Sequence, residues 1–279
     1  MSEAPRSSAV PIPDSESEHI DFVCPNCGHE DKGKYCSNCG QKVIHAEDLT
    51  LKHAWHHIMH EAVHVDGKIF TTLKLLITQP GQLTLDFWAG RRARHVHPIR
   101  LFLLIGVVFF FFAHFSSPIA QPEIFATKPR FGIKPLDDRM EQSGKTAEEL
   151  KVEIEAKVAA ALKPLYIGTI LAQGFSLWLL YRRQRPYLAE HMVVALHLAS
   201  FAMLTWIALG WLLLVGVPRN ITGNAWTLVN LFYFLFSLRR IYGGSWPVLL
   251  WRWLVINVFA GLIIVGTLMA TVVLVLKHY

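Results

Sequence analysis

Two Cys-x-x-Cys pairs near the N-terminus are the residues whose type and spacing most clearly suit chemistry. They are Cys24-Pro-Asn-Cys27 and Cys36-Ser-Asn-Cys39, and a glycine follows each pair. Four thiolates at this spacing can surround one Zn²⁺ tetrahedrally, and a glycine at that point allows the positive φ that turns backbone N–H groups toward sulfur. The pattern predicts a zinc ribbon over residues 22–42, with one structural Zn²⁺ held by Cys24, Cys27, Cys36 and Cys39.

Other interpretations of the cysteines fit the surrounding residues less well. They are four unrelated reduced thiols, a redox Cys-x-x-Cys, or a site in which His29 replaces one thiolate; no βαβ pattern surrounds the pairs, as a redox motif would need. All of the chain's cysteines lie here, so we expect a reducing compartment and no disulfide framework. The spacer between the pairs is balanced in charge and offers no basic strand to nucleic acid. We therefore expect a structural or protein-docking module.

Five histidines cluster in the helix expected over residues 51–65. At 100° per residue they fall within about 100° of arc, on the side opposite the apolar residues. This face is interpreted as a solvated face, a sensor of pH or lipid phosphate, or a metal site, because part of it matches one histidine box of membrane di-iron enzymes. Such enzymes need several boxes, so the solvated face of an interfacial helix is favoured. The histidines are His53, His56, His57, His60 and His64.

The composition excludes a soluble globule. Hydrophobic residues make up 52% of the 279 residues and charged residues only 17%. The first apolar run, residues 99–117, would form a helix about 28 Å long, which matches the thickness of the hydrocarbon core of a bilayer. We predict an all-α integral membrane protein with five transmembrane helices, over residues 99–117, 165–181, 187–217, 221–238 and 246–276.

Arginine clusters give the predicted orientation. They occur at residues 91–100, before the first span, at 182–185, between the second and third spans, and at 239–240, between the fourth and fifth spans. Because basic residues favour the cytosolic side, the N-terminus is predicted in the cytosol and the C-terminus outside. The expected domains are an acidic disordered tail over 1–21, the ribbon, cytosolic interfacial helices over 47–97, and the transmembrane domain over 98–279 with an extramembrane segment at 116–163. The lipid bilayer is the expected partner, and binding to nucleic acid is not expected.

Ionisable residues inside the apolar runs suggest a second site. Glu190 and His197 are seven residues apart and share one helical face, and Arg252 lies in the cytosolic half of the last span. A charge in the hydrocarbon costs about 2.5–3.5 kcal/mol on insertion scales, so these groups should pair or face water. The sequence predicts a polar pocket open to the cytosol, or alternatively interface and packing residues. The candidates are Glu190, His191, His197, Arg252 and Asn257.

Several motifs resemble those of a bacterial membrane family known as domain of unknown function 3667. They are Pro80-Gly81, Gly90-Arg91-Arg92 and Pro98-Ile-Arg-Leu-Phe, within a likeness that covers roughly Cys36 to Phe115. The stretch Arg185-Pro-Tyr-Leu-Ala-Glu-His is similar to a polar motif of longer members. The resemblance implies a bacterial inner-membrane protein with an N-terminal zinc ribbon and brings no assigned chemistry.

Two functions of different classes follow from these features. The first is a non-enzymatic scaffold, which recruits a protein through the ribbon or senses lipid. The second is a membrane enzyme or carrier for a lipid or small molecule, which uses Glu190, His197 and Arg252. The first is favoured because the sequence contains no nucleophile–base pair, no phosphate loop and no full set of metal boxes.

Overall fold

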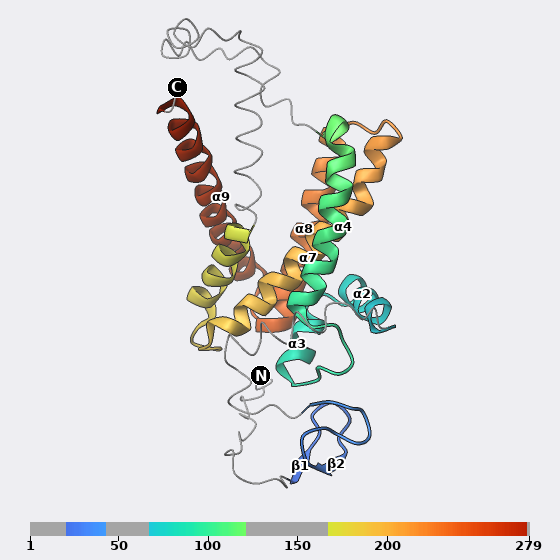
Figure 1. Ribbon diagram of the computed structural model, residues 1–279. Coiled ribbons are helices and arrows are strands. Elements are labelled where there is room, and N and C mark those ends of the chain that lie inside the picture. Colours follow the sequence, from blue (N-terminus) through green and yellow to red (C-terminus); the bar gives the residue numbers. More distant parts are fainter. Residues whose placement is uncertain (1–20, 43–66, 121–166, 278–279) are drawn as a thin grey trace, which may run out of the picture.

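A computed structural model describes residues 21–42, 67–120 and 167–277 of the chain (Figure 1). The acidic tail, the histidine face at 53–64 and most of the segment 116–163 lie outside the described residues.

The N-terminal module is built from two short strands and two similar turns. β1 (Asp21–Val23) pairs antiparallel with β2 (Glu30–Lys32). In the first turn the Gly28 N–H donates to the Cys24 carbonyl over 2.8 Å, and in the second the Gly40 N–H donates to the Cys36 carbonyl over 2.8 Å. Both glycines have positive φ, 75° and 71°. The two Cys-x-x-Cys-Gly segments thus form matching turns.

Two short helices precede the long helices of the bundle. α2 (Lys68–Thr78) ends just before Pro80, and α3 (Gln82–Trp88) begins after Gly81, whose φ is 81°. Proline cannot continue a helix and glycine accepts the left-handed conformation, so this dipeptide turns the chain. The inner faces of both helices are buried against α7 and α8, with Leu76 and Thr84 each 1% exposed.

The remaining helices are apolar and differ in length. They are α4 (Pro98–Ala120), the helix Ile167–Tyr181, α7 (Leu188–Leu214), α8 (Arg219–Tyr242) and α9 (Trp246–Lys277). Within the described residues, three segments are long and apolar enough to cross a bilayer: Leu188–Leu214, Arg219–Tyr242 and Trp246–Ile263. Ile167–Tyr181 and the part of α4 over Pro98–Phe112 are shorter apolar segments. The chain is therefore a mostly helical protein with helices that suit a membrane.

The core of the bundle lies where α4, α7 and α8 pack side by side (Figure 1). Phe201 and Tyr233 stack there with ring centroids 3.4 Å apart, and Leu101 and Leu238 are fully buried. α9 contacts α8 and diverges from α4 and α7 toward its C-terminus (Figure 1).

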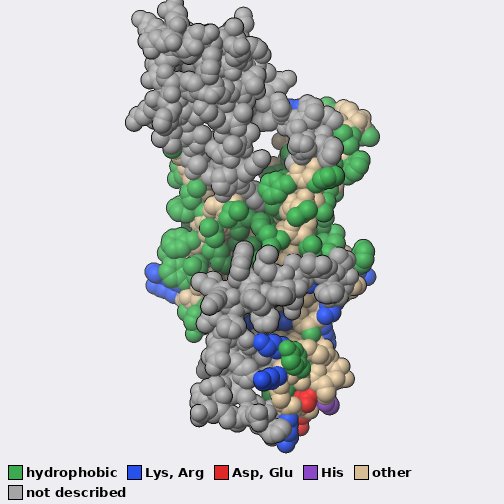
Figure 2. All heavy atoms as spheres, in the orientation of Figure 1, with side chains coloured by type: hydrophobic (Ala, Val, Ile, Leu, Met, Phe, Trp, Pro, Cys, Tyr) green, Lys and Arg blue, Asp and Glu red, His purple; other side chains and the backbone are tan. Residues whose placement is uncertain are grey.

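The outer surface of the bundle is apolar. Val107 and Leu262 are 71% and 66% exposed, and Figure 2 shows a band of hydrophobic side chains with Lys and Arg along its lower edge. An apolar band bordered by cations is the surface expected of a protein surrounded by lipid. The lower edge of this band is also the end of the bundle at which α2 and α3 lie (Figure 1).

Candidate metal centre and contacts at the bundle end

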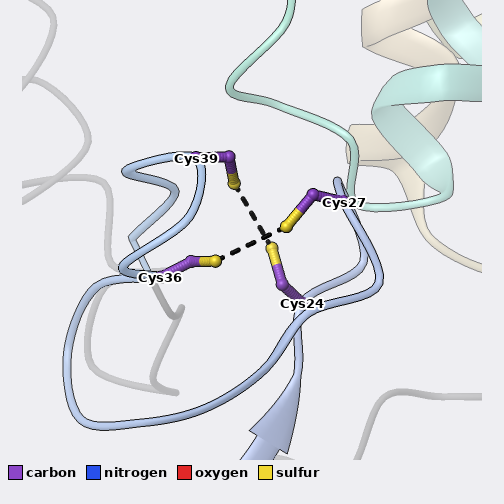
Figure 3. Close-up of side chains that lie close together, drawn as sticks. All are labelled: Cys24, Cys27, Cys36 and Cys39. Carbon is purple, nitrogen blue, oxygen red and sulfur yellow. Dashed lines mark hydrogen bonds between the residues drawn. The ribbon is translucent and has the colours of Figure 1, made fainter.

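The four cysteine side chains point toward one centre (Figure 3). All four Sγ atoms lie within 4.8 Å of one another, with Cys24 and Cys39 3.6 Å apart and Cys27 and Cys36 3.5 Å apart. Sulfurs bound tetrahedrally to one zinc at about 2.3 Å would be about 3.8 Å apart. The cysteines are free of disulfides. This cluster could hold a metal ion, and its four sulfur donors fit a soft or borderline cation.

The surroundings divide the four thiols into two kinds. Burial raises the pKa of Cys24, and it raises that of Cys36 to about 12. A hydrogen bond from the His29 backbone lowers the pKa of Cys27, and one from the Asn26 side chain lowers that of Cys39 to about 6. The thiols of Cys27 and Cys39 therefore lose their protons more readily than an ordinary cysteine. A cation at the centre would favour the thiolate form of the buried pair, Cys24 and Cys36.

Asp31 joins the spacer to the second turn. Its carboxylate accepts hydrogen bonds from the backbone N–H and the hydroxyl of Ser37, and from the Lys32 N–H over 2.8 Å. The Ser37 hydroxyl, the Ser37 N–H and the Lys32 N–H together lower the pKa of Asp31 to about 2. This carboxylate remains charged over the physiological range, so it holds the two halves of the module together.

Gln41 fastens the cysteine module to the loop that precedes α4. Its Nε2 donates to the Gly90 carbonyl over 2.8 Å, and its Oε1 accepts from the N–H groups of Arg92 and Ala93 over 3.1 Å each. Gln41 is only 8% exposed, and a Cβ placed on Gly90 would lie 3.2 Å from Pro25. The module therefore rests directly on the loop 90–93 and has a defined position on the bundle.

Asp86 organises the other side of the same loop. Its carboxylate receives hydrogen bonds or ion pairs from the side chains of Gln82 (2.7 Å), Arg91 (3.0 Å) and His95 (3.0 Å). The Thr72 hydroxyl accepts from the Val96 N–H over 3.1 Å. The arginine loop is thereby held by α2, α3 and the cysteine module together.

Replacing Gln41 by Ala is expected to loosen this loop. The substitution removes all three contacts. The Arg92 N–H keeps the Gly90 carbonyl at 3.0 Å, whereas the Ala93 N–H loses its acceptor, at a cost of about 1–3 kcal/mol. Hydrogen exchange of the amides at 90–93 should accelerate, while exchange in α7 stays unchanged. Gln184→Ala is the matched control, because Gln184 is exposed. Unchanged exchange at 90–93 would contradict this role of Gln41.

The five polar residues predicted within the spans have different partners. Glu190 pairs with Arg185 at 3.0 Å, and His191 contacts the Tyr242 hydroxyl at 2.7 Å and the Arg185 carbonyl at 3.0 Å. His197 Nδ1 lies 2.9 Å from the Thr84 hydroxyl of α3. The structure thus brings Glu190 and His191 together at Arg185 and directs His197 toward another element.

Arg252 and Asn257 lie on a different helix, α9. The Arg252 guanidinium sits 4.4 Å from the centre of the Tyr181 ring, and the Asn257 amide donates to the Trp253 carbonyl over 2.8 Å. No ion pair joins Arg252 to Glu190 among the described residues. Arg252 therefore contributes to packing with an aromatic face, a cation–π contact.

Aromatic residues connect these polar contacts. Tyr181 and Tyr242 stack with centroids 3.8 Å apart, Trp88 packs on Tyr242 at 5.9 Å, and Arg185 lies 4.7 Å above the Trp88 ring. Residues of α3, α7, α8, α9 and the helix Ile167–Tyr181 thus meet at one end of the bundle. Tyr181, Tyr242 and Trp88 were not predicted from the sequence as partners of these polar residues, although all three stand at helix ends near arginines.

The apolar helices and the cysteine cluster define a class: a helical membrane protein with an N-terminal module that could hold a metal ion. Residues 66–110 match the family model described as "Protein of unknown function (DUF3667)". This is the family that the motifs resembled, so the resemblance is confirmed over these residues, which cover α2, α3, the arginine loop and the start of α4. No curated protein and no solved structure matches the chain significantly.

Proposed function

We propose that this protein is a non-enzymatic membrane scaffold whose N-terminal module binds one structural Zn²⁺ and recruits a protein partner on the cytosolic side of a bacterial inner membrane. In this proposal α4 and the helix Ile167–Tyr181 also cross the bilayer, which makes five spans. Two features support that topology: both helices are apolar, and the arginines at 91–94, 182–185 and 239–240 flank helix ends on one side.

The observation that carries the proposal is the attachment of the cysteine module to the loop before α4. Gln41 fixes it on the loop before α4, so it has a defined orientation toward the membrane. At the same time it exposes two large apolar side chains, Val23 at 63% and Tyr35 at 60%. A small metal-stabilised module held in place with exposed apolar residues is suited to bind another protein.

Site-specific cross-linking in cells tests recruitment. A photoreactive residue at position 23 or 35 is expected to capture the same protein, and capture should be lost when Cys36 and Cys39 are both replaced by Ser. The same probe at position 183, which is exposed at the arginine-rich end of the bundle, is the control. Capture that survives loss of the cysteines, or that occurs equally from position 183, would oppose the proposal.

The proposed topology makes its own prediction. Reporters that are active on one side of the membrane only, fused after Gln142 and after Tyr279, should both report the outside. The expectation follows from the arginine clusters, since each basic residue favours the cytosolic side. A fusion after Gln184 should report the cytosol and serves as the internal control. If either of the first two reports the cytosol, the span number or the orientation is wrong.

The second candidate function is an enzyme or carrier that acts at the polar contacts near Glu190. The observation in its favour is that one oxygen of this carboxylate, Oε2, is buried without a hydrogen-bond partner among the described residues. Such a group is either costly or used for a ligand. Replacing Glu190 by Gln or Arg252 by Gln, with protein abundance monitored, distinguishes the two functions. Loss of the cellular phenotype at normal abundance would favour the second candidate over the scaffold.

A further inference from the structure

A groove lies between α2, α3 and the loop 91–95, beside the point at which the cysteine module is attached. Its volume is about 670 Å³. Its polar lining consists of four basic side chains, two amides, one hydroxyl and one carboxylate, namely Lys68, Arg91, Arg94, His95, Gln79, Gln82, Thr71 and Asp86. We call this the basic groove.

The charges of the basic groove are unequal. Lys68, Arg91 and Arg94 are cations, and the lining contains one carboxylate, Asp86. Asp86 is occupied by Arg91 at 3.0 Å and His95 at 3.0 Å. Lys68 and Arg94 are exposed and have no acidic partner in the part of the chain that the structure describes. Two cations therefore remain available for an anion. The Gln79 amide adds a neutral donor, and the Gln82 amide has one N–H left after it donates to Asp86.

The position of the groove favours a lipid over a solute. The loop 91–95 leads directly into α4, whose apolar side chains belong to the outer band of the bundle. α2 buries Thr72 and Leu76 but exposes Phe70 at 75% and Ile77 at 53% on another face. A short helix with exposed apolar residues and a basic side is typical of the membrane interface, where its apolar residues meet acyl chains and its cations meet headgroups.

We propose that the basic groove binds the phosphate of an anionic phospholipid headgroup. Lys68 and Arg94 contact the phosphate directly, and Arg91 contributes charge while it stays paired to Asp86. Gln41 stabilises the loop of this site, because it accepts hydrogen bonds from the N–H groups of Arg92 and Ala93, which lie between Arg91 and Arg94 in the chain. This binding does not depend on the recruitment of a protein partner and goes beyond it.

Native mass spectrometry of the detergent-purified full chain tests the proposal. The probes are phosphatidylglycerol, phosphatidylcholine and soluble glycerol 3-phosphate. The wild type should bind phosphatidylglycerol in preference to the other two. The double variant Lys68→Gln/Arg94→Gln should bind it about thirtyfold more weakly, since each basic residue near an anionic headgroup contributes about 1 kcal/mol.

A matched control distinguishes binding in the basic groove from general attraction to the other arginines at the same end of the bundle. Arg183→Gln/Arg240→Gln removes the same charge from two exposed arginines outside the groove and should leave binding close to the wild-type value. Arg94→Lys should retain binding because the charge remains. Zinc content and thermal unfolding verify that the variants fold.

Three results would overturn the proposal. They are equal losses in the two double variants, equal binding of phosphatidylglycerol and phosphatidylcholine by the wild type, and binding of glycerol 3-phosphate as tight as that of phosphatidylglycerol. The last result would make the ligand a free phosphate ester rather than a lipid.

Discussion

Replacing Cys36 and Cys39 together by Ser is expected to remove the metal and unfold the N-terminal module. Domains shorter than about 40 residues rarely fold without a metal, disulfides or a partner, because their core is too small. Zinc binding to comparable peptides supplies about 10–16 kcal/mol at neutral pH, so losing two of four thiolates removes the main source of stability. Elemental analysis should fall from one zinc per chain to below about a third.

The effect should remain local. Hydrogen exchange should accelerate across 21–42 and at the Gln41-bound amides of Arg92 and Ala93, whereas the core of α7 and α8 keeps its protection. Lys34→Ser/Tyr35→Ser is the matched control, because it changes two exposed residues of the same module. Full zinc content in the cysteine variant would show that other residues bind the metal.

Acid should release the metal from the wild type as well. Protons compete with a cation for thiolates, so zinc occupancy decreases as pH falls. Asp31 has a pKa of about 2 in the folded module, below its ordinary value of 3.8, because Ser37 and Lys32 donate hydrogen bonds to it. Its contribution to stability is therefore complete above the ordinary value and is lost as pH falls toward 2. Zinc release at mildly acidic pH should thus precede any loss of the Asp31 contacts.

The features predicted well from the sequence are those that depend on neighbours along the chain. The matching turns follow from Cys-x-x-Cys-Gly, and α7 and α8 lie within a few residues of the apolar runs at 187–217 and 221–238. Local spacing and hydropathy contain this information, because a turn or a span is decided within a short stretch.

The features that the sequence did not predict depend on residues far apart. Gln41 meets Gly90 across 49 residues, and Thr84 meets His197 across 113. The helical rise gave the depth of Glu190, His197 and Arg252 but not the rotation of one helix about its axis relative to the next. The three residues therefore have different partners, namely Arg185 for Glu190, Thr84 for His197 and the Tyr181 ring for Arg252.

The resulting arrangement at the bundle end depends on a close approach between the α2–α3 turn and α8. Gly81 has φ 81°, and a Cβ at this position would lie 3.0 Å from the backbone oxygen of Ser237 and 3.1 Å from Ile241 Cγ1. The backbone oxygen belongs to the last two turns of α8, one turn after the buried Tyr233, and cannot shift without disturbing the packing of that residue and its neighbours. The Tyr233 hydroxyl itself donates to the Leu76 carbonyl over 2.8 Å, which fixes α2 on α8.

Gly81→Ala is therefore expected to destabilise the bundle by about 2–5 kcal/mol. The left-handed conformation costs a non-glycine residue about 1–2 kcal/mol, and overpacking adds about 1–3 kcal/mol. Gly216→Ala separates the two terms, because Gly216 also has positive φ (85°) but has no atom within 4 Å of the added Cβ. Unfolding in mixed detergent micelles should therefore show a loss for Gly81→Ala well above that for Gly216→Ala. Equal losses would mean that α2 and α3 are not packed on α8 as closely as the contacts of Gly81 require.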